Sequence, residues 1–476
     1  MIGFAQRARI PWIGLAIALV ILGYGYLAPS ITTHDPLVQR VLSIFAATVV
    51  LWITKPIPYA ISSVLCVILL YAFGTVDSFG EAVSGFASEI IFFFILLYII
   101  GTSVAKVDLD AWVARRLISR SSTPRRSGRR LSGAIMLLAL VMPSGIARTV
   151  TFMPVVDQIT EYYGLAEDSP FRRFAYYVLG HLNPVASLAV MTGSGMAVTT
   201  AVLINDFVQP FTWLEWAVYL IPPIVTLYVI CIIIVTRLYA IADSDQDTID
   251  PDDIDFADDG IEPLDRDQRI VVALLGLAVC LWVVGSFVGV PAIIPAMLVV
   301  FVLAVPGVDI VTTEEVLSVS WGIVFLIGAM LSLLAVMQEV NAMDRIIDTL
   351  IVIVPMTGPV VITAIMLFVM GMVVRGTFSS STAAIVIMLP ILLEFGGAVG
   401  INPLYTAFTL MMLYNATAFL PFNAPTVLIS HETGPLTLVE IFGLCLVTLL
   451  VVASIATVSW VIYWPFVDAL FAGIFG

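Results

Sequence analysis

Two apolar stretches of the sequence are interrupted at their centres by short polar segments whose residue types suit anion binding. Residues 131–160 are broken at Pro143-Ser144-Gly145, and residues 357–396 are broken by the run from Arg375 to Thr382, which reads RGTFSSST. Hydroxyl groups and glycines gather at both breaks. Polar backbone at membrane depth is tolerated only beside protein or a water-filled cavity. Both stretches are therefore predicted to be re-entrant hairpins whose tips line a site.

Two further apolar stretches are broken in the same way. Residues 174–205 are interrupted at Met191-Thr192-Gly193-Ser194-Gly195, and residues 403–430 at Pro421-Phe422-Asn423-Ala424-Pro425-Thr426. Broken helices expose free N–H groups that favour anions and free carbonyl groups that favour cations. Four broken elements that converge near the membrane midplane would form a cage for a small anion with one or two sodium ions.

Arg148 follows the first hairpin tip and admits two interpretations. An arginine at membrane depth costs about 2.5–3.5 kcal/mol on insertion scales, so it should face a polar cavity and a negative partner. In the first, its guanidinium binds a carboxylate or sulfate oxygen of a substrate. In the second, it makes a structural pair with Asp157, Glu161 or a backbone carbonyl. Arg375, at the mouth of the other hairpin, either contributes to the site or extends to the outer surface.

Composition places most of the chain in lipid. Of its 476 residues, 61% are apolar and 11% are charged, against roughly 25% charged in soluble domains. A net charge of -14 without a basic groove excludes a nucleic-acid binder. The four cysteines have no paired spacing that would suit a metal, and no phosphate loop, HExxH or GxSxG motif occurs. The sequence therefore predicts neither an enzyme nor an organic cofactor.

The apolar runs predict an all-α polytopic membrane protein of the cell membrane. A helix needs about 20 apolar residues to cross the hydrocarbon. Eleven spans are predicted, at 10–28, 38–54, 57–73, 88–105, 174–205, 213–241, 269–287, 291–306, 320–338, 403–430 and 437–464. With a cytoplasmic N-terminus and an external C-terminus, sixteen Lys and Arg residues lie inside and two outside, as the positive-inside rule requires.

An internal repeat organises these spans. Leu51-Trp52 aligns with Leu281-Trp282, Asn183 with Asn415, and the hairpin serines Ser144 and Ser380 follow the same shift. The prediction is one helix at 1–37, a first repeat at 38–242, an acidic cytoplasmic linker at 243–268 and a second repeat at 269–476. Each repeat holds an odd number of crossings, so the second copy is inverted. Inverted repeats with interrupted helices are typical of secondary transporters.

The residues also resemble a known family. Leu51-Trp-Ile-Thr-Lys-Pro-Ile-Pro58 is similar to a signature of the divalent anion:sodium symporters, and the two S-x-x…P hairpins resemble that family's paired SNT motifs. The resemblance covers residues 38 to 464. It implies an elevator-type homodimer that carries di- or tricarboxylates or sulfate. Pro143-Ser144-x-x-Ala147-Arg148 resembles the exchanger branch, in which an arginine occupies the region of one sodium site.

Taken together, the sequence predicts a secondary active transporter of small divalent or trivalent anions, either sodium-coupled or anion-exchanging. A channel or an intramembrane enzyme is the alternative. The residues predicted to bind substrate are Ser144, Gly145, Arg148, Thr192, Ser380, Ser381, Thr382, Asn423 and Thr426. The residues predicted as Na⁺ ligands are Gly193, Thr377, Ser381 and Ala424. The sequence does not decide which anion is carried.

Overall fold

The structure, a computed structural model, describes residues 9–27, 35–118, 123–141, 144–239, 263–353 and 360–475. All regular elements within these residues are helical. Seven of the described helices are long and apolar enough to cross a membrane, and five more apolar helices are shorter. Pro143 and residues 243–262 of the predicted acidic linker lie outside the described residues.

Most predicted spans of the first half appear as helices, and the predicted span 174–205 is interrupted. The elements are α2 (Arg9–Leu27), α3 (Pro36–Thr54), α4 (Tyr59–Ala72), α5 (Phe79–Ala82), α6 (Glu89–Lys106), α7 (Leu109–Ile118), α8 (Pro124–Val141), α9 (Gly145–Tyr162), α10 (Pro170–Tyr177), a π-helical segment (Val178–Leu182), α11 (Asn183–Ala186), α12 (Gly195–Phe207) and α13 (Trp213–Leu238). The predicted span 174–205 is therefore two helical arms around a break.

The second half repeats this order. Its elements are α14 (Arg266–Val288), α15 (Ile293–Ala304), α16 (Thr313–Leu317), α17 (Trp321–Glu339), α18 (Ala342–Ile353), α19 (Val360–Arg375), α20 (Ser381–Ala398), α21 (Pro403–Ala416), α22 (Pro425–Thr433), α23 (Leu438–Val458) and α24 (Trp464–Phe475). The last predicted span, 437–464, continues beyond its predicted end as α24. The sequence did not predict the amphipathic helices α7 and α18, because neither is an apolar run.

Backbone geometry recurs at matching places in the two halves. Left-handed residues occur in the pairs Lys55 and Gly289, Gly74 and Gly307, Asp108 and Asn341, and Gly164 and Gly400. Capping boxes open α13 at Thr212 and α23 at Thr437. Each reciprocal box satisfies two N–H groups that would otherwise lack an acceptor. The same local chemistry therefore begins and ends corresponding helices in both halves.

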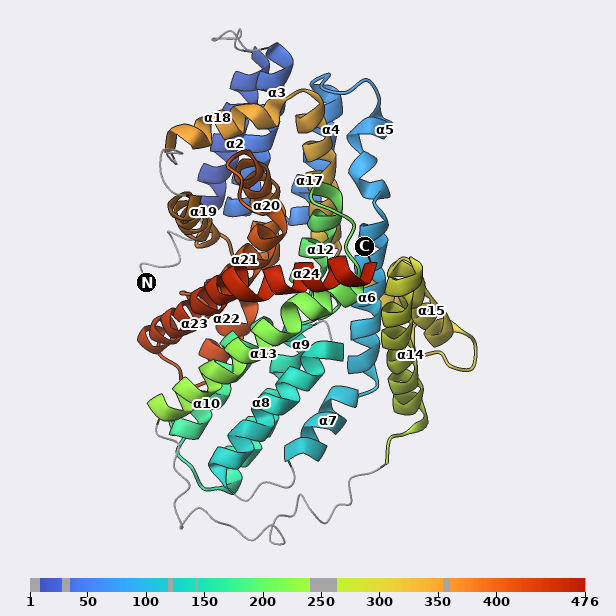
Figure 1. The fold of residues 1–476 in the computed structure, drawn as a ribbon, viewed down its shortest axis with the longest axis vertical. Coiled ribbons are helices and arrows are strands. Elements are labelled where there is room, and N and C mark those ends of the chain that lie inside the picture. Colours follow the sequence, from blue (N-terminus) through green and yellow to red (C-terminus); the bar gives the residue numbers. More distant parts are fainter. Residues whose placement is uncertain are drawn as a thin grey trace.

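The broken helices meet in the middle of the molecule. In Figure 1, α8, α9 and α10 lie below the centre, whereas α18, α19 and α20 lie above it. Elements of the two halves interlock there, since α12 packs on α20 and α21, and α22 packs on the π-helical segment. Thr426 Oγ1 donates to Gly180 O at 2.8 Å, and Asn415 Nδ2 donates to Pro184 O at 2.9 Å. Hydrogen bonds thus join the breaks of one half to those of the other.

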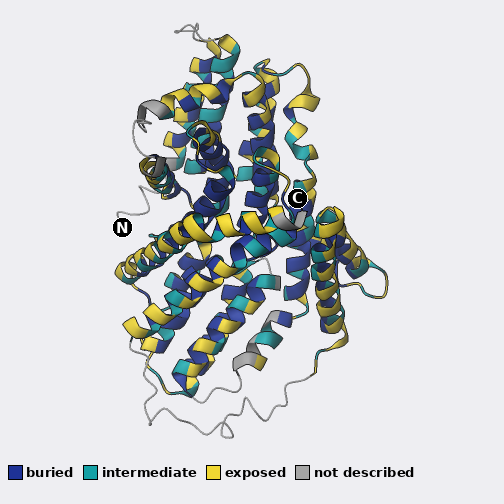
Figure 2. Ribbon diagram, in the orientation of Figure 1, coloured by how far each residue is buried: buried dark blue, intermediate teal, exposed yellow. Residues whose placement is uncertain are grey.

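Burial follows the same arrangement. Figure 2 shows buried residues concentrated on the central helices and exposed residues along outer helices such as α14 and α23. In the most apolar window of each helix, 72% of α20 is buried but only 28% of α14. The apolar exposed faces of the outer helices match the lipid contact that the composition predicts.

One close backbone approach fixes the short 3-10 helix Ser84–Ala87, which precedes α6, against α17, and we expect the substitution Gly85→Ala to disrupt it. A Cβ atom on Gly85 would lie 2.3 Å from Ser332 N and 2.5 Å from Gly328 O. Because both are backbone atoms, the helix must shift, and the apparent Tm of the purified protein should fall by about 5 °C or more. The control Gly80→Ala meets only Ser78 Oγ at 3.6 Å. Equal melting of the two variants would contradict the prediction.

Candidate functional site

A cavity of about 310 Å³ lies where the two hairpin tips meet, and we call it the tip cavity. Seven residues predicted from the sequence line it: Ser144, Gly145, Ser380, Ser381, Thr382, Ala424 and Thr426. Ser187, Ser194, Gly195 and Asn415 complete the wall on the side of the interrupted helices. Residues more than 230 positions apart in the chain therefore share one small space.

Four helices begin at this cavity. Ser144 starts α9, Ser194 starts α12 and Ser380 starts α20, and each serine Oγ accepts a backbone N–H of its own helix at 3.1–3.3 Å. The fourth helix, α22, begins at Ala424, whose side chain cannot cap it. The first N–H groups of a helix carry a partial positive charge of roughly half a unit. None of the described residues that line the cavity has a formal charge. Its electrostatics therefore favour an anion.

Arg148 anchors the first tip to the break of its own half. The side chain is completely buried, and its Nε donates to Asn183 Oδ1 at 2.7 Å. Its Nη2 bonds Ser187 Oγ, and Asn183 Nδ2 donates to Gly145 O at 2.7 Å. Asp157, which the sequence offered as a partner, instead pairs with Arg172 at 2.9 Å. The guanidinium thus stands directly behind the cavity wall.

Arg375 anchors the second tip in the same manner, and of its two interpretations the extension to the outer surface is wrong. The side chain is completely buried. Its three nitrogens donate to Tyr414 O at 3.0 Å, Phe378 O at 3.0 Å, Asn423 O at 2.8 Å and Ser381 Oγ at 2.7 Å. These acceptors belong to the tip and to the break between α21 and α22. The side chain therefore lies inward, where these four oxygens accept its N–H groups.

Besides Arg148, which stands behind the wall, four of the predicted site residues do not line the tip cavity. Thr192 accepts a hydrogen bond from Trp213 Nε1 at 3.3 Å and lines a separate small void. A Cβ on Gly193 would lie 2.2 Å from Ser187 O, so this glycine is packed against backbone. Thr377 is exposed and donates to Val374 O at 2.7 Å. Asn423 is buried behind the tip, where its amide donates to Gly376 O at 3.1 Å.

One wall of the tip cavity was missed from the sequence. It consists of the second half of α6 and the start of α17, and includes Tyr98, Thr102, Ala105, Ser320 and Ile323. From the sequence, both segments are predicted only as plain membrane spans. Gly101-Thr102 inside an apolar run was the available signal. A glycine weakens the interior of a helix, so its presence there indicates that another part of the protein packs closely against the helix.

A profile described as the sodium:sulfate symporter transmembrane region matches residues 10–470. The chain belongs to this family. Membership confirms the resemblance to the divalent anion:sodium symporters and supports a multi-pass membrane transport protein.

Several relatives in this family are named for what they carry. The chain is 25% identical over 424 residues to dicarboxylate transporter 1, chloroplastic, of Arabidopsis thaliana, with 86% of this chain and 75% of that protein covered. It is 22% identical to the sodium-dependent dicarboxylate transporter SdcS of Staphylococcus saprophyticus, covering 81% and 78%. A membrane protein of Cupriavidus necator is 23% identical and is matched over 43% of its own length.

A solved structure shares the fold. The crystal structure of the Alcanivorax borkumensis YdaH transporter aligns with a TM-score of 0.53 at 14% identity, covering 97% of this chain and 98% of that one. This similarity concerns the arrangement of helices alone.

Removing the guanidinium at the second tip tests the importance of these contacts. Arg375→Ala leaves four oxygens of the break without their donor, so the tip should lose its shape and the cavity part of its positive potential. We expect calorimetric affinity for succinate to fall roughly tenfold or more. The control Arg345→Ala removes an exposed arginine that pairs with exposed Asp348 at 3.6 Å. Unchanged affinity in the Arg375 variant would show that these contacts do not shape the anion site.

Proposed function

We propose that this protein is a secondary carrier of small dicarboxylates that works by anion exchange, with its two halves acting as inverted repeats. The observation that supports the proposal most directly is the convergence of four helix N-termini on one uncharged cavity, backed by two fully buried guanidinium groups. Two N-termini come from each half. A molecule with a carboxylate at each end matches that distribution of partial positive charge.

The choice of a dicarboxylate rests on size and on relatives. A volume of about 310 Å³ is at the small end of ligand pockets, which fits a short-chain acid better than a large cofactor. Relatives from Arabidopsis thaliana and Staphylococcus saprophyticus are named as dicarboxylate transporters. Sulfate, which the family description includes, is the alternative substrate.

The choice of exchange over sodium symport rests on the two arginines. A sodium site needs several oxygen ligands that face one point. At the second tip the oxygens of Ser381 and Asn423 already accept guanidinium N–H groups of Arg375, and Arg148 occupies the same kind of place beside Asn183. A fixed positive charge there repels Na⁺ at short range. The oxygens beside these two arginines therefore do not fit the sodium ion that the family description implies.

Alternating access is proposed from a second cavity at the opposite ends of the same two helices. The tip cavity contacts α6 between Phe94 and Ala105 and the start of α17. The other, of about 860 Å³, contacts the start of α6 and the end of α17, including Ala335 and Gln338. An elevator movement would carry the tips from one end of α6 and α17 to the other. With the predicted orientation, the present conformation faces the cytoplasm. The homodimer that the resemblance implies stays a prediction.

Exchange predicts transport without sodium. Proteoliposomes loaded with unlabelled succinate should take up labelled succinate at the same initial rate in Na⁺ and in K⁺ media, and uptake should collapse without internal anion. A strict requirement for Na⁺ would refute exchange. Linear flux that needs no internal anion would indicate a channel, and uptake of labelled sulfate alone would refute the dicarboxylate assignment.

The elevator movement predicts a contact that is absent from this conformation. Ile146 at the first tip and Thr102 on α6 both line the tip cavity, and the repeat maps this pair onto Thr382 and Ala335. In a Cys280→Ala background, Thr382→Cys with Ala335→Cys should be cross-linked by a short bifunctional thiol reagent during transport, and uptake should then stop.

The control pair Ile146→Cys with Thr102→Cys should cross-link in the resting protein. If the control pair reacts and Thr382→Cys with Ala335→Cys never does, the tips do not travel along α6 and α17, and the elevator mechanism is wrong.

A further inference from the structure

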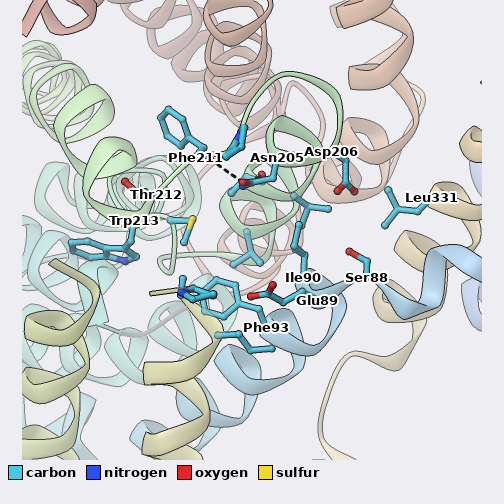
Figure 3. Close-up of a pocket in the computed structure, with 18 of the residues that line it drawn as sticks. Ser88, Glu89, Ile90, Phe93, Asn205, Asp206, Phe211, Thr212, Trp213 and Leu331 are labelled. Carbon is cyan, nitrogen blue, oxygen red and sulfur yellow. Dashed lines mark hydrogen bonds between the residues drawn. The ribbon is translucent and has the colours of Figure 1, made fainter. Parts of the chain in front are cut away.

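Helix α7 and the first turns of α8 form the most basic segment of the sequence. Residues 107–130 contain seven arginines and two aspartates. The two helices pack against each other, below the centre in Figure 1. The side chains of Arg116, Arg126 and Arg129 are exposed, and we call these three residues the arginine patch. None of them lines the tip cavity or the larger cavity that Figure 3 shows, so the patch is separate from both.

One face of α8 joins this charge to an exposed apolar strip. At 3.6 residues per turn, Arg126, Arg129, Gly133 and Leu137 all fall within about 80° around the helix. Leu137 is 54% exposed, and a Cβ on Gly133 would meet no atom within 4 Å. From Arg129 the strip extends about 12 Å along the helix to Leu137, at a rise of 1.5 Å per residue. Charge and open apolar surface are therefore continuous on this face.

The arginines of α8 repel one another within the protein. Arg125 and Arg129 are four residues apart, as are Arg126 and Arg130, and like charges at that spacing destabilise a helix. The first turn of α8 contains no acidic residue that would offset them. An anion bound at this face would reduce the repulsion and stabilise the start of the helix.

The carboxylates of the neighbouring region do not remove this excess of positive charge. Helix α8 meets α9 through another face, where Ser127 Oγ lies 3.3 Å from Tyr163 Oη. Beyond that face, Asp157 pairs with Arg172 at 2.9 Å. Even if the other carboxylate of α9, Glu161, is counted against the patch, positive charge prevails.

We propose that the arginine patch binds the phosphate of an anionic phospholipid, with an acyl chain along Gly133 and Leu137. Basic residues directly outside an apolar helix attract anionic headgroups. The ring of Trp112 on α7 lies 5.1 Å from the Arg116 guanidinium, and tryptophan is typical of the membrane interface. The Asp-rich residues 243–262 also carry negative charge, but an acidic peptide would leave the apolar strip bare, whereas a phospholipid covers both. This binding does not depend on the proposed carrier function.

Lipid titration of the purified full-length protein, followed by native mass spectrometry and thermal melting, tests the site. Dioleoylphosphatidylglycerol should bind saturably and raise the apparent Tm by about 2 °C or more, whereas dioleoylphosphatidylcholine should do neither. Binding should weaken roughly tenfold or more in Arg126→Gln/Arg129→Gln. The matched control Arg237→Gln/Arg269→Gln removes two exposed arginines at the ends of α13 and α14 and should bind as the wild type does. Equal weakening in the two double variants, or no preference for phosphatidylglycerol in the wild type, would overturn the proposal.

Glycerol 1-phosphate, which carries the phosphate without acyl chains, distinguishes a lipid from a free phosphate. It should bind far more weakly than phosphatidylglycerol, and Leu137→Ser should weaken binding of the lipid alone. If the two ligands bind equally well, the apolar strip takes no part and the lipid assignment is wrong. If the lipid binds only to a variant whose residues 243–262 lack their acidic side chains, the acidic segment is the occupant and the proposal is equally wrong.

Discussion

The requirement that every polar backbone group at membrane depth find a partner within the protein governs this structure. Four broken helices leave carbonyl groups without the hydrogen bonds of a continuous helix. Arg375 supplies donors to three such carbonyls, those of Phe378, Tyr414 and Asn423. Leaving a buried acceptor unsatisfied costs about 1–3 kcal/mol. The single guanidinium of Arg375 therefore stabilises this tip at membrane depth by satisfying three such acceptors.

This arrangement separates the two kinds of helix end. The carbonyl groups face the buried guanidinium groups, and the N–H ends of α9, α12, α20 and α22 face the tip cavity. Under the proposed exchange mechanism, the same contacts that stabilise the breaks occupy oxygens a cation would need and leave the donors an anion needs. In the proposed carrier, anion selectivity and the stability of the breaks have one physical origin.

The sequence predicted the site features that depend on residue type. It did not predict those that depend on where a side chain points in the folded protein. Ser144, Gly145 and the run from Ser380 to Thr382 line the cavity, because polar residues at a break must face a polar space. The inward course of Arg375 could not be predicted, because its acceptors are mostly carbonyls, which every residue carries. Residues such as Thr102 on α6 were missed because they lie in an uninterrupted apolar run and reach the cavity only through packing.

The two arginines show why repeat alignment alone does not reveal the site. Shifted by the 236 positions that relate Ser144 to Ser380, Arg148 falls on Ala384, and Arg375 falls on Ala139. Arg148 therefore reaches its break from the second arm of its hairpin, and Arg375 reaches its own from the first arm. Each nevertheless bonds the tip, or the asparagine bound to the tip, together with the interrupted helix of its half. The inverted copies that we propose require equivalent backbone shapes. The side chain that stabilises each shape can come from any neighbouring position, provided that its charge also suits the anion.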